Sequence, residues 1–176
     1  GKTEKAKSLL EESRQQVESS SDPASIKELC KITLSLYPRH LDSLEKLFKI
    51  AREEEDSAAF FHWGRELADC YEVRSDWDKV SQVYRDLAHA EPKDTSSRQR
   101  LFELLLASGK PEEAAGHLRE VYQIYLESEN LKLAIETLHQ VESVDKENPE
   151  TLELLANLYN RIGDHEQEMR HLLAAA

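Results

Sequence analysis

The sequence predicts an all-α protein in which antiparallel helices stack into a right-handed α-solenoid. Apolar residues recur at the i, i+3, i+4 and i+7 spacing of a helix, and no segment alternates apolar and polar residues long enough for a strand. Five Gly and five Pro are few for 176 residues, which favours long regular elements over turns. The chain also repeats itself at an interval of 54 residues, which places Tyr71 on Tyr125 and Gly109 on Gly163. Such a period in a helical sequence is typical of a stacked array, where each unit buries its apolar face against the next.

About ten helices joined by short turns account for the pattern. The first is a charged helix over residues 3–19. The second begins after Asp22, a favoured N-cap, because Pro23 stands at the first helical position, where a missing N–H costs no hydrogen bond. It ends before Pro38, which cannot continue a helix. The later helices are expected at 41–54, 56–74, 76–90, 95–108, 111–128, 130–144 and 149–162, with a last one after residue 164.

Glycine and proline mark two boundaries in the second half of the chain. Gly109 is expected to end its helix in the left-handed conformation, which glycine adopts without steric cost, and Pro111 to begin the next one. Gly163 repeats this signal one period later, and Asp164 is expected to cap the final helix.

The repeat interval also predicts the domain organisation. Residues 39–92 and 93–146 are complete units of three helices, while 1–38 and 147–176 are partial units. We therefore interpret residues 1–176 as a single helical-repeat domain. Its last residues lack the polar face that usually closes such an array, so we expect the chain to be a fragment of a longer protein.

The core is predicted from apolar positions that share a phase of the repeat. They are Leu47, Leu67, Tyr71, Val80, Tyr84, Leu101, Val121, Tyr125, Leu138, Leu155 and Tyr159. The helix at 56–74 is apolar on more than one side, which indicates packing on more than one side. Its residues Phe60, Phe61 and Trp63 are interpreted as core, with an aromatic ligand pocket as the alternative.

Several stretches share one order of apolar, small, aromatic and turn residues. The matching sets are Leu155, Ala156, Tyr159, Gly163, Asp164 and Leu172; Leu67, Ala68, Tyr71, Ser75, Asp76, Val80, Tyr84, Leu87 and Pro92; Val121, Tyr122, Tyr125, Glu129, Asn130, Ala134, Leu138 and Val141; and Leu101, Phe102, Leu105, Gly109, Ala114 and Leu118. The chain therefore resembles the tetratricopeptide repeat (TPR), a 34-residue pair of antiparallel helices. The longer interval departs from that family by one further helix, so the helices at 56–74 and 111–128 are expected to serve two successive pairs.

The sequence offers no catalytic or cofactor-binding constellation. It has no Gly-rich phosphate loop, no Gly-x-Ser-x-Gly motif and no CxxC motif. None of its seven His residues forms an i, i+3 or i+4 pair, the spacing of a zinc-binding helix, and His165 and His171 are six residues apart. We therefore predict that the protein is not an enzyme and binds no cofactor and no metal.

Charge, hydropathy and cysteine content indicate which classes of partner are expected. The formal net charge is −12 and no helix carries the basic stripe that binding to phosphates requires, which excludes nucleic acid as an expected partner. No apolar stretch reaches the 18 residues or more of a membrane-spanning helix, so direct membrane insertion is not expected. Cys30 and Cys70 lie at apolar helical positions, and we expect buried, reduced thiols and a cytoplasmic location.

The resemblance to the TPR family implies a binding function, because arrays of this family present extended surfaces to proteins or peptides. We predict a monomeric, non-catalytic adaptor or scaffold that binds a protein or peptide through its helical-repeat surface. The alternative is a structural spacer or self-association module of a larger assembly, in which the unfinished ends of the array stack on one another.

Polar residues that recur in register on the long helices suggest where a partner docks. The predicted partner-binding set is Arg65, Asp69, Arg119, Gln123, Asn157 and Arg161. If these residues line an inner face, the partner is acidic or mixed in charge, because the planar guanidinium of Arg binds carboxylates through two hydrogen bonds. The alternative is that they form ion pairs between helices, which contribute little at a surface.

Overall fold

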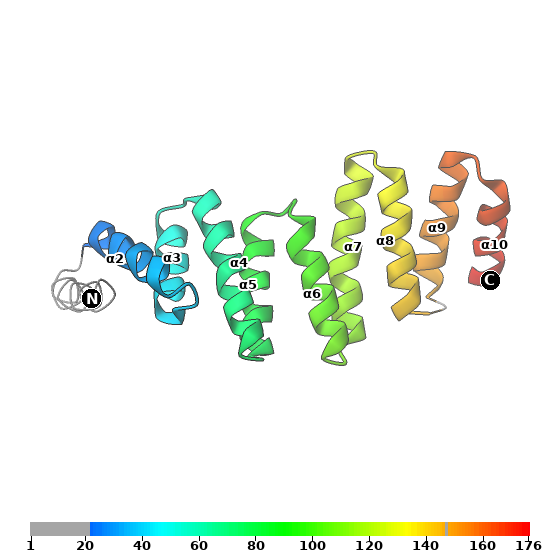
Figure 1. Ribbon diagram of the computed structural model, residues 1–176. Coiled ribbons are helices and arrows are strands. Elements are labelled where there is room, and N and C mark those ends of the chain that lie inside the picture. Colours follow the sequence, from blue (N-terminus) through cyan, green and yellow to red (C-terminus); the bar gives the residue numbers. More distant parts are fainter. Residues whose placement is uncertain (1–21, 147) are drawn as a thin grey trace. The chain divides into compact units, whose positions relative to one another are not determined.

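The computed structural model describes residues 22–146 and 148–176, so the helix expected at 3–19 lies outside the described residues. The chain divides into two compact units, one that ends at Val83 and one that runs from Tyr84 to Ala176, and each is described by itself. All regular elements in the described ranges are α-helices, which confirms the predicted all-α class (Figure 1).

The described part of the chain contains nine helices. They are α2 (Pro23–Leu36), α3 (Leu41–Glu53), α4 (Ser57–Val73), α5 (Trp77–Ala90), α6 (Thr95–Ala107), α7 (Pro111–Glu127), α8 (Leu131–Val144), α9 (Pro149–Ile162) and α10 (His165–Ala175). Within the second unit each helix from α6 to α10 packs against the next one along the chain. Short turns join them, so neighbours run antiparallel. Such helix pairs, with the motif residues at their contacts, form a TPR-like helical-repeat fold.

The helix starts recur at the interval seen in the sequence. They fall at Pro23, Trp77 and Leu131; at Leu41, Thr95 and Pro149; and at Ser57, Pro111 and His165. The left-handed residues that follow the helices share the interval, with Glu55, Gly109 and Gly163 in one phase and Ser75 and Glu129 in the other. Gly109 and Gly163 have φ angles of 72° and 78°, which confirms their predicted place at helix ends.

Local capping bonds explain why the helices begin where they do. The Asp22 carboxylate accepts a hydrogen bond from the Ser25 amide at 3.0 Å, and Asp164 accepts one from the Gln167 amide at 3.2 Å. Both N-caps were predicted from the sequence. His40 caps α3 in the same way, because its Nδ1 accepts from the Ser43 amide at 3.3 Å.

In the first unit α3 packs against both α2 and α4. The rings of Phe48 and Phe60 stack with their centroids 4.4 Å apart, and Phe60 is only 5% exposed. Phe60 is therefore core, as interpreted from the sequence, whereas Phe61 and Trp63 are half-buried. The hydroxyl of the buried Tyr71 donates to the Glu45 carboxylate, which joins α4 to α3.

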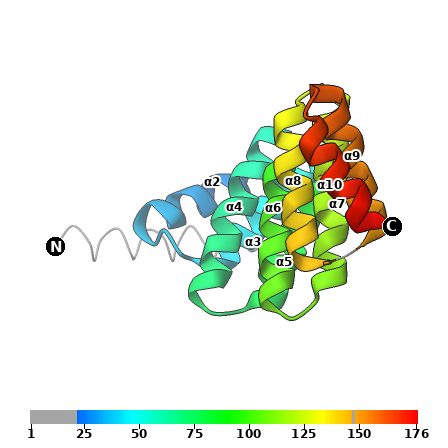
Figure 2. The same ribbon diagram turned by 90° about the vertical axis from the view of Figure 1, so that its right-hand side faces the viewer.

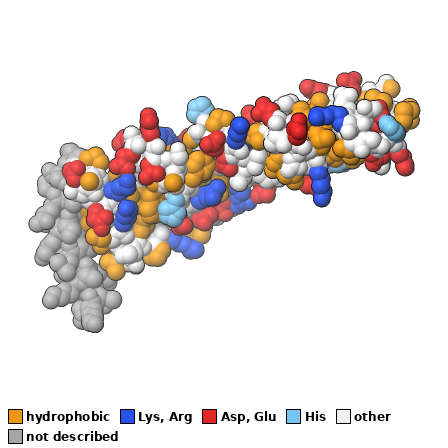
Figure 3. Space-filling view, turned by 90° about the horizontal axis from the view of Figure 1, so that it is seen from above, with side chains coloured by type: hydrophobic (Ala, Val, Ile, Leu, Met, Phe, Trp, Pro, Cys, Tyr) orange, Lys and Arg blue, Asp and Glu red, His pale blue; other side chains and the backbone are white. Residues whose placement is uncertain are grey.

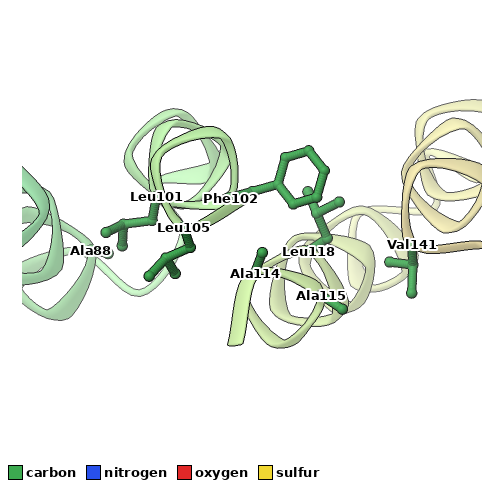
Figure 4. Close-up of a cluster of buried hydrophobic side chains, with 8 residues drawn as sticks. All are labelled: Ala88, Leu101, Phe102, Leu105, Ala114, Ala115, Leu118 and Val141. Atoms are coloured by element: carbon green, nitrogen blue, oxygen red, sulfur yellow. The ribbon is translucent and has the colours of Figure 1, made fainter. Parts of the chain in front are cut away.

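The second unit contains two clusters of buried apolar side chains. The first consists of Ala88, Leu101, Phe102, Leu105, Ala114, Ala115, Leu118 and Val141 (Figure 4). The second consists of Tyr122, Ala134, Ile135, Leu138, Leu155 and Leu158. Because α7 contributes to both clusters, it is apolar on two sides. It therefore shares its packing between the helices before it and those after it, as the sequence predicted for the long middle helices.

The predicted core is largely confirmed. Most of the apolar positions that share a phase are buried, including Leu47, Leu101, Leu138 and Leu155. Tyr84, Tyr125 and Tyr159 are partly buried and pack against the edges of the two clusters in the second unit. Cys30 and Cys70 are free and buried.

Candidate functional site

The residues of the predicted partner-binding set lie on three helices. Arg65 and Asp69 are exposed on α4, in the first unit. Arg119 is half-buried on α7, and its neighbour Gln123 is exposed. Asn157 and Arg161 are exposed on α9, which also lies in the second unit.

Arg119 is used within the protein. Its guanidinium donates to the Asp145 carboxylate at 2.8 Å, just after the end of α8. The same carboxylate oxygen accepts from the side-chain amide of Asn148, the N-cap of α9, at 2.7 Å. Arg119 therefore holds the turn between α8 and α9 against α7, so the ion-pair alternative describes this residue.

Arg65 occupies the same repeat position but has a different neighbour. Its guanidinium carbon lies 6.0 Å from the centroid of the Phe61 ring, within range of a cation–π contact. The position equivalent to Phe61 on α7 is Ala115, which offers no ring. One repeat phase therefore does not guarantee one role.

In the second unit, α7 and α9 are brought together near Tyr122. Burial raises the pKa of the Tyr122 phenol, and the positive charge of Arg161 on α9 opposes part of that rise because it favours the phenolate. Tyr122 also belongs to the buried cluster that contains Leu155 and Leu158 of α9. Gln123 and Asn157 are exposed on the same two helices.

The structure places Leu172, named in the sequence as a repeat-motif residue, in an exposed apolar stripe on α10. Met169, Leu172 and Leu173 have the i, i+3, i+4 spacing of one helix face and are 54%, 44% and 73% exposed. One repeat earlier, Ala115 and Leu118 stand at the positions of Met169 and Leu172, and both are 0% exposed. Hydrophobic side chains also reach the surface at the right-hand end of Figure 3, over the C-terminal helices.

Two buried polar groups also escaped the sequence analysis. Arg98 is 8% exposed at the repeat position that Leu44 and Leu152 fill elsewhere. Its guanidinium donates to Glu120 at 2.8 Å and to the Asp94 carbonyl at 3.1 Å, so these bonds satisfy the buried charge. Nearby, Nδ1 of His117 is buried without a hydrogen-bond partner among the described residues and lies 3.8 Å from the Glu120 carboxylate.

A cluster of ligand-type side chains forms where α8, α9 and α10 meet. These helices lie side by side in Figures 1 and 2. His139 contacts Glu142 of its own helix through Nδ1 at 2.9 Å and the Tyr159 hydroxyl of α9 through Nε2 at 2.8 Å. His171 of α10 is 5% exposed, and its ring stacks on Tyr159 with centroids 5.3 Å apart.

The sequence analysis missed this cluster because it searched for ligands within one helix. His139 and His171 come from different helices, and only the packing of α8, α9 and α10 brings their rings to 5.7 Å. One signal was present, since Tyr159 was predicted to be a core residue.

Comparison with known proteins finds solved structures that resemble this chain at low sequence identity. No protein-family model matches the chain, and no curated protein matches it. A structure of MamA from strain AMB-1 is 15% identical, covers 99% of this chain and 82% of its own, and has a TM-score of 0.43. A structure of MamA from Desulfovibrio magneticus RS-1 is 16% identical in sequence and has a TM-score of 0.40. The match covers 89% of this chain and 94% of the MamA chain.

A third solved structure is YrrB, described as a TPR protein with an unusual peptide-binding site. It is 14% identical, with coverage of 92% of this chain and 89% of its own and a TM-score of 0.39. Among the described residues, no helix is both long enough and apolar enough to cross a membrane. The likeness concerns the fold alone, and the helix pairs described above give this chain a TPR-like fold by themselves.

Proposed function

We propose that this chain is a non-catalytic, cytoplasmic adaptor that binds another protein through its helical-repeat surface. The observation that carries the proposal is the exposed apolar stripe of Met169, Leu172 and Leu173 on α10. A stripe of this kind on a helix that is otherwise polar marks a surface suited to a further helix.

The packing of α7 supports an amphipathic helix as the occupant of this stripe. At the repeat positions of Met169 and Leu172, Ala115 and Leu118 belong to one buried cluster with Val141 of α8. On α8 the residues Ala134, Leu138 and Val141 have the i, i+4, i+7 spacing of one helix face, and all three are 0% exposed. We therefore expect the partner to supply an amphipathic helix with small or aliphatic residues at i, i+4 and i+7.

Exposed polar residues of the predicted set form a further docking element within each unit, as part of the same proposal. Arg65 and Asp69 are exposed in the first unit, and Gln123, Asn157 and Arg161 are exposed in the second. In each unit these polar and charged groups suit a partner that is acidic or mixed in charge. Arg119 contributes to the element of the second unit by holding the α8–α9 turn in place.

A synthetic peptide with the sequence of residues 131–144 tests the α10 surface, because it carries the helix pattern that packs beside α7. We expect saturable binding of the labelled peptide to the whole protein, measured by fluorescence anisotropy, and loss of that binding in a Leu172→Glu variant. Leu106→Glu is the matched control, because Leu106 is an exposed leucine on α6, 42% exposed. A peptide that carries Leu138→Glu and Val141→Glu should not bind.

Equal binding by the Leu172→Glu and Leu106→Glu variants would show that the stripe on α10 is not the docking surface. The second candidate function is a self-association module, which the same exposed stripe favours because a second copy could also cover it. Size-exclusion chromatography with light scattering separates the two functions. A monomer that binds the peptide supports the adaptor, whereas a mass that rises with protein concentration supports self-association.

A further inference from the structure

We propose that His139, Glu142 and His171 form a binding site for one divalent transition-metal ion, for which Zn²⁺ is the best candidate. Each of these residues offers one ligand atom, and the three atoms lie within 4.8 Å of one another. Two His and one Glu are a donor set that zinc accepts in proteins with three protein ligands and an open fourth position. The proposal is independent of the docking function proposed above.

The three ligand atoms have to move only a short way to bind one ion. Ligand atoms on one tetrahedral Zn²⁺ lie about 3.3 Å apart, given metal–ligand distances of about 2.0–2.1 Å. His139 Nδ1 and the Glu142 carboxylate are already 2.9 Å apart, at i and i+3 on α8. His171 has to approach this pair by rotation of side chains rather than by movement of a helix, since its ring already lies 5.7 Å from that of His139.

The hydrogen bonds at the other ring nitrogens suit metal binding. The backbone carbonyl of Gln167 can only accept, so the 2.8 Å contact places the proton of His171 on Nδ1 and leaves the Nε2 lone pair available. When Nδ1 of His139 binds the ion, its proton moves to Nε2, where the Tyr159 hydroxyl at 2.8 Å can accept it. Ligating histidines are commonly held by such a second bond to a carbonyl or another oxygen, which fixes the ring and its tautomer.

The site is accessible from one side and closed on the other. The side chains of His139 and Glu142 are 40% and 33% exposed, so an ion can enter from solvent, whereas His171 is almost fully buried. A bound ion would join α8 to α10 across α9. It would therefore anchor the last helix of the unit, whose opposite face carries the exposed Met169, Leu172 and Leu173.

Titration of the tag-free, chelator-treated protein with ZnCl₂ tests the proposal. We expect one ion per chain by calorimetry, and a visible absorption band typical of four-coordinate Co²⁺ when CoCl₂ replaces ZnCl₂. At a free Zn²⁺ concentration about 100-fold above the dissociation constant, the melting temperature should rise by about 5–10 °C. Tyr159→Phe, which removes only the hydroxyl that holds Nε2 of His139, should weaken Zn²⁺ binding about tenfold.

Ligand variants decide the outcome. His139→Ala and Glu142→Gln are expected to weaken Zn²⁺ binding by about 100-fold or more and to abolish the Co²⁺ band. His171→Ala should do the same, and because His171 is buried, circular dichroism must first show that this variant folds. His165→Ala is the matched control on α10, since His165 is exposed and contacts Glu168 instead. The absence of a bound ion, or binding that survives His139→Ala and Glu142→Gln, would overturn the proposal.

Discussion

At the scale of single residues, neighbours decide what a side chain does. Arg65 and Arg119 share a repeat position, yet one lies against an aromatic ring and the other forms an ion pair with Asp145. Arg98 occupies a position that leucine fills elsewhere, and hydrogen bonds to Glu120 and backbone carbonyls make its burial possible. Sequence periodicity therefore identifies equivalent positions but not equivalent roles.

Charge reversal should separate the two arginines. Arg119→Glu places two carboxylates together beside the α8–α9 turn, so we expect a loss of about 1 kcal/mol in the free energy of unfolding, given how little partly exposed ion pairs contribute. Arg65→Glu should change that free energy by less than about 0.5 kcal/mol. Urea denaturation measures both. The double change Arg119→Glu with Asp145→Lys should recover most of the loss, and a failure to recover it would argue against the ion pair.

Tyr71 should make the protein sensitive to alkaline pH. Burial raises the pKa of its phenol, and the hydrogen bond to the Glu45 carboxylate raises it further. Because the folded pKa lies above the unfolded value of 10.0, the stabilisation is complete below pH 10 and is lost as the pH rises above it. Above pH 10 we expect the free energy of unfolding to fall by about 1 kcal/mol per pH unit.

The variant Tyr71→Phe should lose less stability between pH 9 and pH 11 than the unchanged protein, as measured by urea denaturation. Tyr71→Ala should cost about 3 kcal/mol at neutral pH, because it leaves a cavity at a buried aromatic position. Val73→Ala is the control for that loss, since Val73 is 60% exposed on the same helix. If the free energy of unfolding falls equally with pH in Tyr71→Phe and in the unchanged protein, Tyr71 does not cause the alkaline sensitivity.

At the scale of helices, the ends are set locally and the faces are set by packing. Two helices of the second unit end at glycines with left-handed φ angles, whereas α4 and α7 are followed by Ser75 and Glu129 in the same conformation, at φ of 58° and 57°. Residues with a Cβ adopt this conformation at a cost, and glycine does not. The turns at Ser75 and Glu129 therefore carry more backbone strain than those at the two glycines.

Substitutions at Gly109 and Glu129 should change the stability of the protein in opposite directions. Gly109→Ala is expected to lower the free energy of unfolding by about 1 kcal/mol, while Glu129→Gly should raise it by roughly 0.5–1 kcal/mol. A Cβ at Gly109 would meet nothing within 4 Å, so the effect of Gly109→Ala comes from the backbone alone. Thermal and urea melts of both variants measure it. Changes of the same sign in the two variants would contradict this account.

At the scale of the whole molecule, the net charge and the apolar stripe on α10 act in opposite directions on self-association. The net charge of −12 opposes close approach of two copies, while the stripe on α10 favours it. We expect repulsion to dominate at moderate ionic strength, so that the protein runs as a monomer of 20.3 kDa in light scattering. A dimer under those conditions that dissociates in the Leu172→Glu variant would instead identify the α10 stripe as a self-association surface.

For the helices in the described part of the chain, the sequence by itself determined the boundaries, because the signals that begin and end a helix act within a few residues. Asp22 with Pro23, and Gly163 with Asp164, gave boundaries within one residue of those in the structure. The period of the apolar residues also predicted which faces are buried, since the faces of an α-helix follow from its geometry.

Only the tertiary structure decided the candidate sites. The contact of His139, Tyr159 and His171 depends on how three helices pack, and no spacing within one helix encodes it. The exposure of Leu172 depends likewise on whether a further helix covers α10, because its counterpart Leu118 has the same residue type and is buried. Local sequence fixes backbone conformation, whereas burial and proximity are properties of neighbours that lie far away along the chain.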